Sequence, residues 1–477
     1  MKKFLIFSIL IGLTVASCTD DITDYNVDPK NPAEVPAEFT FTNAEKELAD
    51  VINDMSVGSN VFRLWAQHWT ETTYNDEANY DVIGRDLADG YWTIIYSRVL
   101  NDLKSSREAI QADEFLDEET RANKLAIIDI LEVYSYQMLV DLSGDVPYSE
   151  TLNIDNFTPV YDDAATIYED LIRRVSEDQA TLSNGGSSFG TADIFYNGDV
   201  AKWRKFANTL KLRLGMRLAD VNESLASSTV SEAYNDGVME SSDDSAIINY
   251  ESSAPNTNPV YELFELNNRA EDYVAGATSV NYLQSVNDPR IDDFFDENIE
   301  DGYLGGPIGA NNSYAAYTHI DPDLVATPDA PGAVLEYYEA QFFLAEAVER
   351  GFISGDAEQF YENGVTASIL KYNGTQEEAE AYLAQSGVAY NSANWEELIG
   401  TQKWIALFNR GFEAWTEYRR LDEPDFLVNS ALSDLPVPNR VFYPTEEPAL
   451  NSENYEAAVQ NLGGEDDLYT KIFWDVQ

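Results

Sequence analysis

Apolar side chains recur at intervals of three and four residues along much of this chain of 477 residues. This spacing places them on one face of an α-helix, whereas the alternation of apolar and polar residues that marks a half-buried strand is scarce. The sequence therefore predicts a mostly α-helical fold with few, short strands. One of the clearest helical runs is Trp92, Ile95, Val99 and Leu103.

Four further segments show the same period. The first is apolar nearly all round and is expected to be buried, whereas the second is amphipathic. We expect the fourth segment to open a helix at Trp404. The residues that mark them are Leu125, Ile128, Leu131, Val133, Tyr134 and Met138; Trp203, Phe206, Leu210, Leu214 and Leu218; Leu335, Tyr338, Phe342 and Ala345; and Trp404, Leu407 and Phe408.

Phe62, Trp65 and Trp69 form a shorter stripe at helical spacing, and we expect these rings to lie in the core. Of the two histidines in the chain, His68 falls on the same predicted helix and is expected to be structural.

Three long stretches show no helical pattern. Residues 72–90 and 296–332 are rich in Gly, Asn and Tyr, and residues 424–448 contain five prolines and predict a tail that wraps over the surface. Loops of this length are uncommon in compact domains and are often functional.

The first 17 residues have the pattern of a secretory signal peptide. Lys2 and Lys3 precede about twelve mostly apolar residues, fewer than the roughly 20 that a membrane-spanning helix needs. Val15-Ala16-Ser17 then leads into Cys18, the only cysteine in the chain. This is the pattern of a lipobox, so we predict cleavage before Cys18 and acylation of its thiol.

Residues 18–38 are acidic and contain three prolines, and they predict an extended tether. Asp20 and Asp21 follow the cysteine closely. This acidic start resembles the surface-export signal of Bacteroidetes lipoproteins. No interior linker is visible after this segment, so we predict a single domain over residues 39–477.

The formal net charge is −56 and is spread along the chain. It argues against nucleic acid or an anionic membrane surface as a partner, and against highly anionic ligands unless calcium bridges them. Since 44% of the residues are apolar, the chain can still form a large core.

Catalytic motifs are weak. Gly186–Gly190 fits GxSxG, but the residues before it are polar and do not predict the strand that a nucleophile elbow requires. With 85 Asp and Glu residues, a pair of carboxylates has no specificity as evidence for a hydrolase. We expect no enzyme activity, no metal and no cofactor. One basic cluster is expected to pair with carboxylates of neighbouring helices: Lys202, Arg204, Lys205, Lys211, Arg213 and Arg217.

Several blocks in order along the chain resemble the SusD/RagB family of nutrient-binding outer-membrane lipoproteins. The most specific is LVDLSGDVPYSE at 139–150, although the family often has Phe where Leu142-Ser143 precede Gly144. The other blocks are NVDPKNP at 26–32, YD at 161–162 with YEDL at 168–171, KWRKFANTLKLRL at 202–214, NDPR at 287–290, FLAEA at 343–347 and QKWIALF at 402–408.

The resemblance implies tetratricopeptide-like helix pairs packed with a loop-rich ligand-binding region. It also implies lipid anchoring in the outer membrane, facing the cell exterior, and a SusC-like TonB-dependent transporter over which the protein closes as a lid. The implied ligand is an oligosaccharide or, as in some members, an oligopeptide. A surface hydrolase and a pure scaffold protein remain as alternatives.

A sugar site needs exposed aromatic rings, on which C–H faces stack, with amides or carboxylates beside them. Two of the long loops carry such residues, and the family layout suggests that they face each other. The predicted ligand-binding residues are Tyr74, Asn75, Asn79 and Tyr80 in the first loop, and Tyr303, Tyr314 and Tyr317 in the second.

Overall fold

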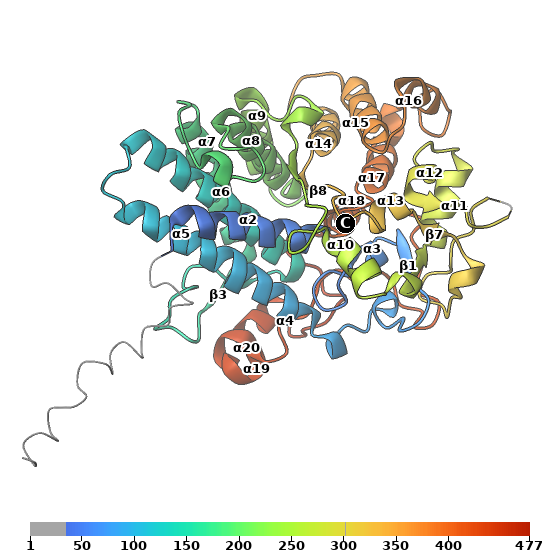
Figure 1. Ribbon diagram of the computed structural model, residues 1–477, viewed down its shortest axis with the longest axis horizontal. Helices are drawn as coiled ribbons and strands as arrows, with labels where there is room; N and C mark the ends of the chain where they lie inside the picture. Colours follow the sequence, from blue (N-terminus) through green and yellow to red (C-terminus); the bar gives the residue numbers. More distant parts are fainter. Residues whose placement is uncertain (1–34, 301) are drawn as a thin grey trace, which may run out of the picture.

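The computed structural model describes residues 35–300 and 302–477 (Figure 1). The predicted signal peptide, Cys18 and most of the predicted tether lie outside these residues. Helix α2 (Ala37–Asn53) begins two residues before the boundary expected at residue 39. Pro36 precedes it, and Phe41 is among the α2 side chains buried in the core.

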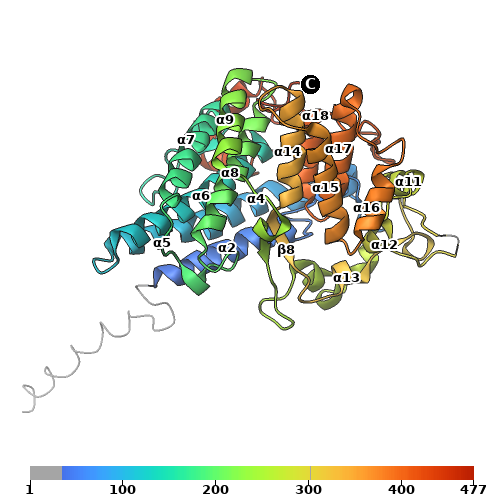
Figure 2. The same cartoon turned by 90° about the horizontal axis from the view of Figure 1, so that it is seen from above.

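Helices dominate the structure, as predicted. Long helices lie side by side in consecutive pairs, and Figure 2 shows α6, α7, α8 and α9 as one group beside α14, α15 and α17. The paired helices are α5 (Asn101–Ala112), α6 (Glu118–Ser143), α7 (Ala164–Leu182), α8 (Val200–Arg217), α9 (Glu223–Asp236), α14 (Tyr337–Glu349), α15 (Ala357–Lys371), α16 (Gln376–Leu383), α17 (Trp395–Ala406) and α18 (Gly411–Leu421).

Helix α6 is buried on nearly every side along its second half, as its sequence predicted. It begins where the Asp117 side chain accepts a hydrogen bond from the backbone N–H of Thr120. It ends at Gly144, whose φ of +91° lies in the left-handed region that only glycine adopts without strain.

The strands are short, and every strand pair in the described residues is antiparallel. None of these pairs extends into a wider sheet. The part of the fold that carries the long loops, which we call the loop-rich half, is therefore held together mainly by contacts between loops and between side chains. The pairs are β1 (Trp69–Glu71) with β5 (Tyr273–Ala275), β2 (Val146–Pro147) with β3 (Tyr161–Asp162), β4 (Ala246–Ile248) with β8 (Gly332–Leu335), and β6 (Phe295–Asp296) with β7 (His319–Ile320).

The stretches predicted to be irregular contain only short elements, and the second of them lies on the right of Figure 1. The first ends in a continuous helical segment that passes from α4 (Leu87–Trp92) through a wider π-helical stretch (Thr93–Leu100) into α5. The other short helices are α10 (Pro259–Tyr261), α11 (Ala277–Ser285), α12 (Ile291–Phe294), α13 (Pro322–Val325), α19 (Glu447–Leu450) and α20 (Ser452–Asn461).

The helix expected from Phe62 to Trp69 is shorter than predicted. Helix α3 (Phe62–Trp65) ends because the next turn would have to pass through Gln67, whose φ is +58°. Trp69 lies in β1, yet all three predicted core rings are buried, which confirms their role. His68 is buried too; its Nε2 lies 3.1 Å from the carbonyl oxygen of Trp404, and burial lowers the pKa of His68 to about 3.

Two predicted helix starts are wrong. Trp404 lies near the end of α17, because the exposed Glu396 and Glu397 of its first turn give no apolar signal. Leu335 pairs with Ala246 in the β4–β8 ladder, so α14 begins only at Tyr337.

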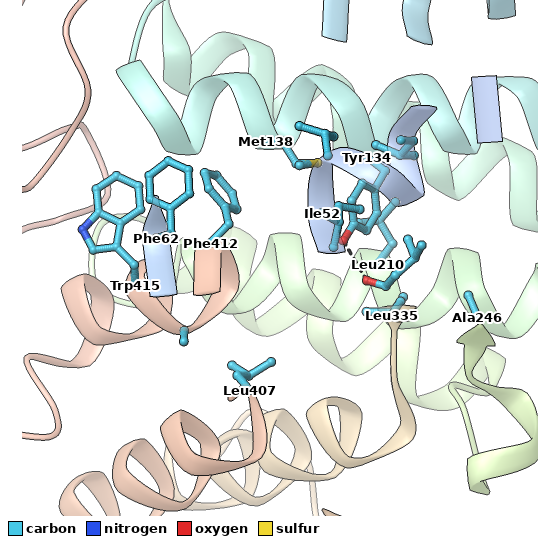
Figure 3. Packing of buried hydrophobic residues seen from close by; sticks show 14 of the residues in the cluster. Ile52, Phe62, Tyr134, Met138, Leu210, Ala246, Leu335, Leu407, Phe412 and Trp415 are labelled. Atoms are coloured by element: carbon cyan, nitrogen blue, oxygen red, sulfur yellow. Dashed lines mark hydrogen bonds between the residues drawn. The ribbon is translucent and has the colours of Figure 1, made fainter. Parts of the chain in front are cut away.

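Buried aromatic rings join the loop-rich half to the helix pairs (Figure 3). Phe62 of α3 stacks on Trp415 of α18 with ring centroids 4.9 Å apart, and the edge of Phe412 meets Phe62 at 5.0 Å. These contacts fix the position of β1 and of the loop that follows it.

The basic residues of α8 pair mainly with carboxylates of other segments, as predicted. Arg213 Nη2 lies 2.5 Å from Glu339 of α14, and Arg217 lies 2.6 Å from Glu413 of α18. Arg410 contacts the second oxygen of Glu339 at 2.5 Å, so one buried carboxylate holds two guanidinium groups between helices.

Candidate ligand-binding site

Two loops that are far apart in the sequence lie against each other. The first loop (residues 72–86) follows β1, and the second loop (residues 302–318) leads into β7. The side-chain amide of Asn75 donates to the carbonyl oxygen of Ala310 and to Oδ1 of Asn311, each 3.2 Å away. Asn312 donates in return to the backbone oxygen of Glu71 at 2.8 Å. The two loops therefore lie against each other, and the assignment of their tyrosines to a ligand site stays a prediction.

A third loop (residues 424–436), from the proline-rich stretch, joins them. Asn79 donates to the Gly309 carbonyl at 2.9 Å, and its Oδ1 accepts from Ser430 Oγ at 3.0 Å and from the Ser433 N–H at 3.2 Å. The Ala431 N–H donates to the Ile308 carbonyl at 2.8 Å. We call this meeting point the three-loop junction.

Gly309 is required at this junction. Its φ is +68°, and a Cβ built there would lie 2.9 Å from Ala78 O, Asn79 Oδ1 and Ser430 Cβ. A side chain would therefore both strain the backbone and separate the loops.

A shallow hollow of about 510 Å³ opens where α11 meets the second and third loops. The rings of Tyr282 and Phe426 lie on its wall, stacked 4.7 Å apart with an angle of 13° between their planes. In the part of the chain that the structure describes, this lining contains no charged side chain. The lining residues are Ala277, Thr278, Asn281, Tyr282, Pro307, Ile308, Phe426, Val428, Asn429 and Ala431.

Polar groups on the lining are few. Asn281 and Asn429 are exposed, whereas the Thr278 hydroxyl donates to Gln67 Oε1 at 2.6 Å and is thereby occupied. The hollow therefore offers an apolar floor, one pair of stacked rings and two accessible amides. Such a surface suits an uncharged ligand with both apolar and hydrogen-bonding faces.

The predicted tyrosines occupy different environments. Tyr74 is 67% exposed at the tip of the first loop, and its ring is available to a ligand. Tyr303 is half-buried and its hydroxyl donates to Asp292 at 2.7 Å. Tyr314 stacks on His319 with ring centroids 3.8 Å apart. Tyr317, which lies between these two residues in the sequence, is half-buried.

Tyr80 does not belong to the candidate surface. It is only 3% exposed, and its ring meets the edge of Trp65 at 6.1 Å inside the core. Its backbone φ of +65° turns the chain inward at this point, which the sequence did not reveal. The side-chain amides of Asn75 and Asn79 already donate hydrogen bonds to backbone carbonyls of the loops. These two residues therefore hold the loops in position, and few of their polar groups are free to bind a ligand.

None of the ten residues that line the hollow was among the predicted site residues. Tyr282 and Asn281 belong to the regular helix α11, where a half-buried ring has no distinctive pattern. Phe426 and Asn429 lie in the stretch predicted to be a surface-wrapping tail. The available signal was the apolar run Phe426-Leu427-Val428 between prolines, because an apolar run on an exposed loop often marks a binding surface.

Two buried carboxyl groups lie beneath the first loop. Glu71 and Glu77 are almost fully buried; Glu71 Oε2 accepts from the Ala78 N–H at 2.9 Å, and Glu77 Oε1 lies 2.7 Å from Arg85 Nε. Burial, followed by the nearby charge of Glu77, raises the pKa of Glu71 to about 10. At neutral pH Glu71 therefore holds its proton, which avoids placing a second carboxylate charge beside Glu77 in the interior.

Metal and membrane features are absent from residues 35–300 and 302–477. No three His, Cys, Asp or Glu side chains of this part are grouped so that they could hold a metal ion. No helix of the same residues combines the length and the apolar character that crossing a membrane requires.

Residues 29–444 match the model of a SusD-like family described as "Starch-binding associating with outer membrane". No curated protein sequence matches the chain. A solved structure called a chitin-binding protein is 28% identical, with a TM-score of 0.80 over 92% of this chain and 99% of its own. A SusD homolog from Bacteroides uniformis is 25% identical, with a TM-score of 0.80 over 92% of this chain and all of its own.

A further SusD homolog, from Bacteroides thetaiotaomicron, is 25% identical, with a TM-score of 0.77 over 93% of this chain and 100% of its own. The family model covers residues 29–444, and each of these structures covers 92–93% of this chain. The chain belongs to the SusD/RagB family.

Proposed function

We propose that this protein is a lipid-anchored, cell-surface nutrient-binding protein that captures oligosaccharides and acts as the lid of a SusC-like TonB-dependent transporter. The observation that carries the ligand class is the uncharged hollow beside the three-loop junction. Its stacked rings Tyr282 and Phe426 and its exposed amides match the apolar and hydroxyl faces of a neutral sugar.

Sugars bind shallow sites through ring stacking and through hydrogen bonds to amides. The second and third loops also expose apolar side chains, which widen the surface that a chain of several sugar units could cover: Leu304, Val428, Leu432 and Leu435. The chitin-binding relative, at 28% identity, supports a polysaccharide-derived ligand.

Anchoring through Cys18 and pairing with a barrel transporter are supported by the lipobox and by the family description, which names the outer membrane. A tether of extended residues before α2 would let the folded domain swing open while its effective concentration near the transporter stays high. The Cys18→Ser protein should leave the outer-membrane fraction and lose its accessibility to external protease. Retention of both would contradict the anchor.

We propose binding without catalysis. Oligosaccharides recovered after long incubation with the protein should be unchanged in length, and a reducing-end assay should stay at background. New reducing ends that scale with protein concentration would favour the surface hydrolase instead.

The partner is tested by purification from native membranes in mild detergent. A large TonB-dependent barrel should accompany the protein in near-equal amount. Recovery of the monomer alone would count against the lid role and would leave glycan binding unaffected. In binding assays, binding of oligopeptides in place of sugars would change the ligand class to oligopeptides.

A further inference from the structure

We infer that the hollow recognises the acetamido group of an N-acetylated amino sugar. The ligand class would then be glycans with repeated N-acetyl groups, in preference to plain, deacetylated or acidic glycans. This inference rests on the proposed function, because it names the chemistry that the same site selects.

The charge around the hollow excludes acidic sugars. Residues 302–320 contain no Lys, Arg, Asp or Glu, and residues 424–436 contain Asp425 and Asp434 but no Lys or Arg. A uronate or sulfate group would therefore find no cation and would approach a protein of formal charge −56.

The same lining disfavours a free amino sugar. An ammonium group gains most from a carboxylate within about 4 Å. Within the described residues the ten lining side chains include no carboxylate, and the Asp434 carboxylate beside the lining already accepts from the Asn429 amide at 3.4 Å. A charged amine placed on the apolar floor would thus lose hydration without a partner in the lining, whereas an acylated amine is neutral.

The floor suits a methyl group. Ala277, Pro307, Ile308, Val428 and Ala431 supply aliphatic surface around a volume of about 510 Å³, within the roughly 300–1,000 Å³ of small-ligand sites. Burying one methyl group raises affinity about fourfold. A hydroxyl group in the same place would gain nothing from this floor and would lose hydrogen bonds to water.

The amides suit the polar half of the acetamido group, which has one N–H donor and one carbonyl acceptor. The Asn429 amide donates to the Asp434 carbonyl at 3.3 Å, so its Oδ1 remains to accept the sugar N–H. None of the hydrogen bonds found among the described residues engages the Asn281 side chain, which leaves its N–H₂ for the sugar carbonyl. One further hydrogen bond adds about fivefold to affinity.

Three β-1,4-linked tetrasaccharides that differ at one substituent provide a direct test by calorimetry: chitotetraose, cellotetraose and fully deacetylated chitosan tetramer. We expect chitotetraose to bind at least about tenfold more tightly than either of the others, from the methyl and hydrogen-bond contributions together.

Equal binding of chitotetraose and cellotetraose would overturn the inference and leave the glycan function intact. Tighter binding of the chitosan tetramer, or binding confined to a glycan without acetamido groups such as maltotetraose, would also overturn it. Failure to bind any oligosaccharide would remove the proposed function as well.

Variants locate the effect. Asn281→Ala and Val428→Asp should each lower the ratio of chitotetraose to cellotetraose affinity toward one, while thermal melts show a folded protein. Phe115→Ala serves as the control, since Phe115 is 98% exposed in the turn between α5 and α6. An unchanged ratio in both hollow variants would place acetamido recognition elsewhere and overturn the assignment.

Discussion

The side-chain amide of Asn79 donates to the backbone carbonyl of Gly309, 2.9 Å away in space and 230 residues away in sequence. The same side chain accepts hydrogen bonds from Ser430 and Ser433. One asparagine therefore connects all three loops that border the proposed site.

Asn79→Ala should loosen the three loops together. Each of the three lost hydrogen bonds to the other loops is worth about 0.5–1.5 kcal/mol, so the variant should fold but lose roughly 1.5–4.5 kcal/mol of stability. Hydrogen exchange followed by mass spectrometry should show faster exchange in residues 72–86, 302–318 and 424–436. Asn79→Asp keeps the oxygen that accepts from Ser430 and Ser433, so exchange in the third loop should increase least in this variant. Faster exchange in the first loop alone for both variants would contradict the proposed connection of the three loops through Asn79.

The Glu71–Glu77 pair predicts a decline in stability at alkaline pH. Because the pKa of Glu71 is raised from 4.5 to about 10, the folded state holds a proton that the unfolded state has released between these values. The free energy of unfolding should therefore fall as pH rises from about 5 toward 10. The charged and titratable groups that face the pair are Arg85, Asp76 and Tyr273.

Glu71→Gln removes the titrating proton and keeps an acceptor for the Ala78 N–H. The variant should melt higher than the parent at alkaline pH, and its melting temperature should vary less between about pH 6 and about pH 9. Glu453→Gln on the exposed face of α20 is the matched control and should follow the parent. A parental pH profile in Glu71→Gln would show that the pair does not control this decline.

Much of the helical architecture could be predicted because periodic apolar residues report burial directly, as in α6 and α8. The failures come from positions where the backbone departs from its local pattern. Gln67 and Tyr80 both take positive φ values. The first ends α3, and the second lies where the predicted ligand ring of Tyr80 is instead buried in the core. The hollow depends on Tyr282 and Phe426, 144 residues apart, and no local pattern brings those rings together.

Glu339 should be among the most costly carboxylates to remove. Glu339→Ala leaves Arg213 and Arg410 buried without this shared partner and should cost about 3–5 kcal/mol in urea unfolding. Glu232 pairs with Lys211 at 2.8 Å but is 64% exposed, so Glu232→Ala should cost at most about 1 kcal/mol. Similar losses for the two variants would contradict the role assigned to the buried pairing.

Salt should stabilise the folded protein. A formal charge of −56 destabilises the compact state by self-repulsion, and the Debye length of about 10 Å at 0.1 M salt shortens as salt increases. The melting temperature should rise from millimolar to seawater concentrations of sodium chloride, and a steady fall would contradict this account.

The most direct test of the central claim is retention of the folded protein in native gels that contain neutral polysaccharides. A double variant, Tyr282→Ala with Phe426→Ala, is compared with Leu370→Asp, which alters a separate hollow of about 670 Å³ lined by α15 and α16. The account predicts that at least one polysaccharide retards the parent and Leu370→Asp equally and no longer retards the double variant. Parental retardation of the double variant, or loss of retardation in Leu370→Asp alone, would contradict it.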